Sequence, residues 1–231
     1  MLCLVMTFDV FAQTRDYIVE MVVFKRPQAS AEAWPKTVEL VYPESRAFFV
    51  GDRPPASAKR GNNVLGELGP ASYALANAAQ RLNRQGGHEV LFHKAWRQSI
   101  GPRNRAPGLV ILGGDSSGDN RELSGYVELG LGRYLHVNAN LWLTQFGSPS
   151  NPDDVWPNLP SPFAAAGVRV NTNSAYAEIS GTQDGYFSRQ PNGIRRIATL
   201  SQHRRMRSNE PHYIDHPLMG ILIEVRKISE E

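Results

Sequence analysis

The chain has one cysteine, Cys3, among 231 residues, so it cannot form an intramolecular disulfide. Its stability must therefore come from a packed core, and a chain of this length with 41% apolar residues can bury one. No window reaches the roughly 18 consecutive apolar residues that a membrane-spanning helix requires. These absences indicate a globular protein whose fold needs no oxidation.

Residues 1–12, MLCLVMTFDVFA, form a short apolar run that ends in Val10-Phe11-Ala12, a pattern that suits a signal peptidase. No Lys or Arg precedes the run and Asp9 interrupts it. We therefore interpret it as an apparently truncated secretory signal peptide, with a poor signal or an N-terminal strand of a cytosolic protein as the alternative. Cleavage after Ala12 would leave a mature chain, residues 13–231, without a cysteine, which excludes thiol chemistry.

Positive charge is in small excess, with a formal net charge of +3. This is too weak for a dedicated nucleic-acid binder but suits an acidic polymer. Acidic residues are missing between Asp184 and Glu210. The same interval contains Arg189, Arg195, Arg196, Arg204, Arg205 and Arg207. Such a cluster is typical of a surface that binds anions, although a solvated face with counter-ions from elsewhere in the fold explains it equally well.

Two strands in strict alternation are predicted within the stretch 121–143. Gly130 and Gly132, between them, suit a tight connection that needs positive φ. The apolar face consists of Leu123, Val127, Leu129, Leu135, Val137, Ala139, Leu141 and Leu143. This hairpin is the centre of the predicted sheet.

The other face of the second strand carries an unusual set of side chains for a solvated sheet. They are Tyr134, His136, Asn138, Asn140 and Trp142. Aromatic rings interleaved with amides suit a sugar or peptide ligand. The alternative is an amphipathic strand whose aromatic residues pack under a loop.

The remaining pattern predicts an α+β fold, namely an antiparallel sheet of about five or six strands with one main helix on one face. The helix, of about four turns, is expected at 71–84, between Gly69-Pro70 and Gly86-Gly87. Further strands are expected at 17–26, 88–96, 197–206 and 218–225, with a turn near 209–217. Residues 144–193 are rich in proline and are predicted to form a long loop insertion at the edge of a single domain, 13–231.

Catalytic motifs are weak. His212 and His216 have the spacing of a helical metal site, with Asp215 nearby, but Pro211 and Pro217 flank them, so a turn is favoured over a metal-dependent hydrolase. The run 113–119, GGDSSGD, lacks the lysine of a P-loop and the acidic spacing of an EF-hand, which favours a turn. We therefore expect no enzyme activity.

Four segments carry a resemblance to a known family: YIVEMVVFKR, LFHKAWRQ, GRYLH followed by LWL, and RRMRSNEPHYIDHPLMGILIEV. In this order they resemble the CsiV family of periplasmic peptidoglycan-binding proteins of gammaproteobacteria. The resemblance implies a non-enzymatic periplasmic protein, without a cofactor, that supports cell-wall assembly and cell shape. It also implies a link to a bifunctional penicillin-binding protein and its lipoprotein activator. The alternative is an adaptor of the synthase that binds no glycan itself.

The two candidate sites fit such a polymer. Asn138 and Asn140 would bind N-acetyl and hydroxyl groups, and the rings of Tyr134 and Trp142 would stack on pyranose faces. The arginine cluster Arg204, Arg205 and Arg207 would bind stem-peptide carboxylates. The sequence leaves open whether the aromatic strand or the arginine cluster is the site.

Overall fold

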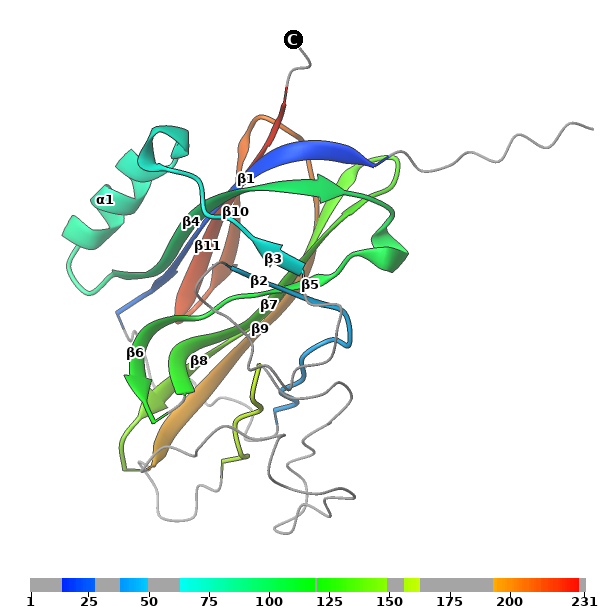
Figure 1. The fold of residues 1–231 in the computed structure, drawn as a ribbon. Helices are drawn as coiled ribbons and strands as arrows, with labels where there is room; N and C mark the ends of the chain where they lie inside the picture. The colour runs from blue at the N-terminus through cyan, green and yellow to red at the C-terminus, as the bar shows by residue number, and fades with distance from the viewer. Residues whose placement is uncertain are drawn as a thin grey trace, which may run out of the picture.

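The computed structural model describes residues 14–27, 38–49, 63–118, 120–148, 156–162 and 193–228. The predicted signal peptide, 1–12, lies outside these residues, as do Arg189 and most of the predicted insertion. Within the described residues the chain forms eleven strands, one α-helix and two 3₁₀ turns. The strands make two sheets (Figure 1).

The first sheet has four antiparallel strands in the order β10-β11-β1-β4. Their bounds are β1 Arg15–Lys25, β4 Glu89–Ile100, β10 Pro211–His216 and β11 Met219–Lys227. β1 is a nearly continuous apolar run because both of its faces are covered. Val19, Met21 and Val23 face the other sheet, whereas Val22 faces a helix.

The second sheet has seven strands in the order β3-β2-β5-β7-β8-β9, and β6 also pairs with β7. Their bounds are β2 Arg46–Phe49, β3 Asn63–Leu65, β5 Gly108–Val110, β6 Gly113–Ser117, β7 Asn120–Leu131, β8 Leu135–Phe146 and β9 Ile194–Met206. The predicted central hairpin is confirmed as β7 and β8, paired in register from Leu123↔Leu143 to Leu131↔Leu135. Its alternating apolar side chains, such as Val127 and Val137, are buried.

The two sheets pack against each other through one shared apolar core. β1, β4 and β11 contribute residues such as Met21, Trp96 and Ile223, and the second sheet contributes residues such as Leu123 and Leu141. Phe49 lies edge-on to Trp96, with ring centroids 5.3 Å apart, in the middle of this core. The core therefore joins strands from both ends of the chain.

The predicted α+β class is wrong, because the described residues form two sheets with a single short helix. The helix expected at 71–84 is a 3₁₀ turn, η1 (Pro70–Ser72), followed by α1 (Ala76–Arg84). Hydrogen bonding explains the late start. The backbone N–H groups of Ala74 and Leu75 donate to the carboxylate of Glu20, at 2.6 and 2.9 Å, so these residues are anchored to β1 ahead of the helix.

Glu20 is fully buried and also anchors the helix-bearing side of the first sheet. Its Oε1 lies 2.9 Å from Nε2 of His93 on β4, and its Oε2 lies 3.7 Å from a guanidinium nitrogen of Arg226 on β11. Beyond this carboxylate, Leu75 and Ala79 pack on Val22, and α1 lies on the outer face of this sheet (Figure 1). Over the described ranges, no helix is long and apolar enough to cross a membrane.

Two predicted turns are strands. Residues 113–117 form β6, which pairs with β7 through a register shift. Residues 211–216 form β10 at the edge of the first sheet, where a proline at the first position costs no ladder hydrogen bond. The aromatic ring of Tyr213 on β10 stacks on that of Phe24. The two rings occupy the space that a side chain at position 220 would need, which Gly220 leaves open. Cross-strand packing therefore stabilises a segment with weak strand propensity.

Candidate functional site

The outward faces of β7, β8 and β9 carry polar side chains in two rows that run across the strands. In one row Glu128 pairs with Asn138, which pairs with His203. In the next row Gly130 pairs with His136, which pairs with Arg205. Because alternate residues of a strand point to the same side, these groups share one surface opposite the core.

A short loop passes over this surface. The 3₁₀ turn η2 (Arg103–Arg105) follows Gly101, whose carbonyl accepts the backbone N–H of Leu131 at 2.7 Å. A Cβ atom at Gly130 would lie 2.6 Å from Cα of Arg103. The absence of a side chain at Gly130 therefore lets η2 lie directly on β7.

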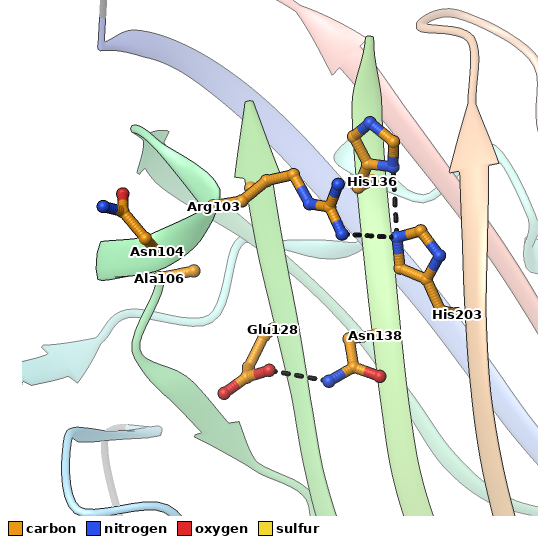
Figure 2. Close-up of a pocket in the computed structure, with 8 residues that line it drawn as sticks. Arg103, Asn104, Ala106, Glu128, His136, Asn138 and His203 are labelled. Carbon is orange, nitrogen blue, oxygen red and sulfur yellow. Dashed lines mark hydrogen bonds between the residues drawn. The ribbon is translucent and has the colours of Figure 1, made fainter. Parts of the chain in front are cut away.

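The loop and the strands together border an open pocket of about 520 Å³. We call it the β7–β9 pocket; it is lined by Arg103, Asn104, Ala106, Glu128, Gly130, His136, Asn138 and His203. Figure 2 shows the guanidinium of Arg103 reaching from the loop toward the two histidines, with Glu128 and Asn138 further along the strands.

The two histidines are stacked, with ring centroids 5.1 Å apart and planes 13° apart. The guanidinium of Arg103 donates to Nε2 of His203 at 3.1 Å, so this nitrogen is an acceptor and the ring is neutral there. Nδ1 of His136 lies 3.1 Å from the same atom, so the two rings and the guanidinium form one contiguous cluster. Burial, reinforced by the positive charges of Arg103 and Arg205, lowers the pKa of His136.

Glu128 supplies the negative group of the pocket. Its Oε2 accepts a hydrogen bond from the Asn138 side-chain amide at 2.8 Å. Among the described residues, no Lys or Arg lies within ion-pair distance of this carboxylate, and no Asp or Glu lies within that distance of Arg103. The pocket therefore contains a cation and an anion that neutral neighbours hold apart.

At the turn between β7 and β8, Tyr134 is 43% exposed. The guanidinium of Arg205 lies 4.5 Å from its ring centroid, and that of Arg133 lies 5.9 Å from it. Both are cation–π contacts, and they hold the ring beside the row that contains His136. Tyr134 thus extends the polar surface with an accessible aromatic ring.

Further along β8 the same face becomes covered. The Oδ1 of Asn140 accepts the hydroxyl of Ser201 at 2.7 Å, but Trp142 is only 4% exposed. Trp142 lies edge-on to Tyr42, with ring centroids 5.0 Å apart, and packs with Leu159 in a second apolar cluster. Its ring is therefore part of the core beneath residues 38–42 and 156–160, and a ligand cannot stack on it.

The three arginines of the predicted cluster do not all lie on one surface. Arg205 lies opposite His136 in register and shares its face, whereas Arg204 lies opposite Val137 and points to the other side of the sheet. Arg207 follows the end of β9, and its backbone N–H and carbonyl both contact Nε2 of His212, at 3.1 and 3.0 Å. Adjacent strand residues alternate, so the separation of Arg204 from Arg205 follows from the strand itself.

The predicted His-Asp-His set is also separated. His212 contacts the backbone of Arg207, His216 accepts the backbone N–H of Leu218 at 3.2 Å, and Asp215 accepts the hydroxyl of Tyr213 at 2.6 Å. His212 and His216 are four residues apart on a strand, a separation of about 13 Å, which is too far for their two imidazoles to bind one metal ion. Within the described part of the chain, no three His, Cys, Asp or Glu residues are placed to hold a metal.

Sequence reasoning missed Arg103, Glu128 and His203 as site residues. The alternation of β7 and β9 places Glu128 and His203 on the outward face, so a correct strand register would have found them. Arg103 gives no such signal, because a loop crossing brings it to the pocket. An isolated glycine in a strand, Gly130, is the one hint that another backbone approaches there.

The comparisons with known proteins bear on the whole chain. No curated protein and no solved structure matches it. The family model described as "Peptidoglycan-binding protein, CsiV" matches residues 1–228, essentially the full length. On this match, the chain belongs to the CsiV family of peptidoglycan-binding proteins.

Proposed function

We propose that the chain binds peptidoglycan through the β7–β9 pocket and the adjoining Tyr134 and Arg205, without catalysing a reaction on it. The observation that carries this proposal is the position of Arg103. Its guanidinium is fixed by a hydrogen bond to a neutral histidine, not by an acid of the described chain. The charge is therefore held in place and is available to a ligand carboxylate.

The neighbouring groups match other parts of the polymer. Asn138 and Asn140 can exchange hydrogen bonds with N-acetyl and hydroxyl groups, and the exposed ring of Tyr134 can stack on a sugar face. A hydrogen bond between charged groups contributes roughly 1.5–3 kcal/mol. Two or three such contacts with one stacking ring correspond to roughly millimolar to micromolar affinity. A repeating polymer would add to this if the protein or a partner binds it at several points.

Binding is favoured over catalysis by the composition of the pocket. Among the described residues that line the pocket, Glu128 is the single carboxylate, whereas glycoside cleavage ordinarily uses two. The imidazole of His203 accepts a hydrogen bond from Arg103, so the nitrogen that would take up a proton as a general base is already occupied. These features suit recognition of an anionic ligand.

We further propose that the protein acts in the periplasm, where it supports cell-wall assembly and cell shape through a bifunctional penicillin-binding protein and its lipoprotein activator. The family resemblance and the apolar residues 1–12 support this role. Peptidoglycan lies in the cell envelope, so a protein that binds it must reach that compartment. A regulatory adaptor that binds the synthase but not the glycan is the competing hypothesis.

Co-sedimentation of the purified protein with isolated sacculi tests the binding proposal. We expect the wild type to pellet, Arg103→Gln to bind roughly tenfold more weakly, and Arg205→Gln to be weakened several-fold, since each loses a charged contact. Arg204→Gln is the matched control, because it removes an equal charge next to Arg205 on the opposite side of β9. A wild-type protein that stays in the supernatant would refute direct binding and favour the adaptor hypothesis.

A further inference from the structure

The pocket contains two opposite charges that do not neutralise each other. Arg103 donates to His203, and Glu128 accepts from Asn138. Both side chains line the same pocket, yet neither has an oppositely charged partner among the described residues. Each is held by a neutral polar group, which keeps the cation and the anion apart at fixed positions (Figure 2).

The backbone places these two side chains at neighbouring positions. Cα of Arg103 lies over Gly130, and Glu128 is two residues back along β7, about 7 Å away. A carboxylate and an ammonium on one carbon, with a charge-assisted hydrogen bond of about 2.8 Å at each end, span about 8 Å. A ligand that carries a carboxylate and an ammonium on one carbon therefore matches the two opposite charges that line this pocket.

We infer that the β7–β9 pocket recognises a free α-amino-acid end, with the ligand carboxylate on Arg103 and its ammonium on Glu128. This inference rests on the proposed function and names the part of the polymer that is recognised. A peptidoglycan stem peptide that contains a diamino dicarboxylic acid exposes such an end, because its side chain carries an amine and a carboxylate on one carbon until crosslinking converts the amine into an amide. An amide has no charge to pair with Glu128, so the pocket selects uncrosslinked stems.

The remaining lining residues agree with this orientation. His136 and His203 lie at the Arg103 end, and Arg205 is next to His136 in register, so a second guanidinium stands beside that end and suits a carboxylate. Asn138 bonds Glu128 through its side-chain nitrogen, which leaves its oxygen as an acceptor beside the carboxylate. The Glu128 end therefore offers acceptors to an ammonium.

The test uses sacculi whose free amines have been N-acetylated, compared with untreated sacculi from the same preparation. Acetylation removes the ammonium and leaves the carboxylate and the glycan unchanged. We expect acetylation to weaken binding of the wild type by roughly tenfold. We expect Glu128→Gln to bind untreated sacculi equally weakly and to be insensitive to acetylation, because the charge that senses the amine is gone.

Glu224→Gln is the matched control, since Glu224 is a half-buried acid on β11 of the other sheet. It should retain the wild-type affinity and the wild-type response to acetylation. If the wild type binds both preparations equally, the inference is wrong while the proposed function stands. If the wild type binds neither preparation, the proposed function fails and the inference fails with it.

Discussion

At the residue scale, neighbours decide the role of each side chain on the outward face of β8. His136 and Trp142 lie on this face six residues apart, yet one lines the pocket and the other is buried against Tyr42. The period of the strand places both side chains outward, but it does not say which of them another segment covers. Burial in turn determines the chemistry that each can perform.

The titration of His136 gives a prediction at this scale. Burial first, and then the positive charges of Arg103 and Arg205, lower the pKa of His136 below its ordinary 6.5. The unfolded chain therefore takes up this proton at a higher pH than the folded chain does. The contribution of His136 to the free energy of unfolding is therefore fully present above about pH 6.5. It is lost as the pH falls through the lower pKa that His136 has in the folded chain.

His136→Asn removes this titration and keeps a donor near the position of Nδ1. Urea unfolding at about pH 5 and about pH 7.5 measures the free energy of unfolding of the variant minus that of the wild type. This difference should be more positive at the lower pH. Taking the difference between the two proteins cancels the other groups that titrate. An equal difference at both pH values would contradict the assigned direction.

At the element scale, the pocket depends on the contact of η2 with β7. The sequence predicts that Gly130 and Gly132 supply positive φ at a tight connection. Neither is among the glycines with positive φ in the described chain. Gly130 instead provides space, because Arg103 lies where its side chain would be. The same residue type thus acts through volume and not through backbone conformation.

Gly130→Ala should therefore destabilise the fold by about 1–3 kcal/mol through overpacking and should weaken sacculus binding by moving Arg103. Gly132→Ala is the control, since its nearest neighbour would be 3.9 Å away. Urea unfolding and co-sedimentation of both variants measure the effects. Equal losses in the two variants would show that the contact with η2 is not responsible.

At the scale of the whole molecule, the shared core fixes how the loop and the three strands of the pocket meet. β9 comes from the C-terminal part of the chain, and η2 from its middle, yet both contact the β7–β8 hairpin. The charge of the molecule, +3, gives only a weak general attraction to an acidic polymer. Specific binding must therefore come from the arrangement of charges in the pocket.

Salt separates these contributions. Raising the salt concentration from about 50 to about 300 mM shortens the screening length and should reduce sacculus binding of the wild type several-fold. Arg103→Gln should lose less over the same range, because it has already lost its main charged contact. Co-sedimentation at several salt concentrations measures both slopes, and parallel slopes would exclude Arg103 as the contact.

The sequence by itself determined the strands with clear alternation, the net charge and the family, because periodicity and motifs are local properties. It predicted the β7–β8 hairpin, β1 and β9 within a few residues. The tertiary structure alone decided that there are two sheets, that Glu20 delays the helix, that Trp142 is covered and that Arg103 crosses Gly130. Each of these depends on contacts between segments far apart in the chain, which no local pattern encodes.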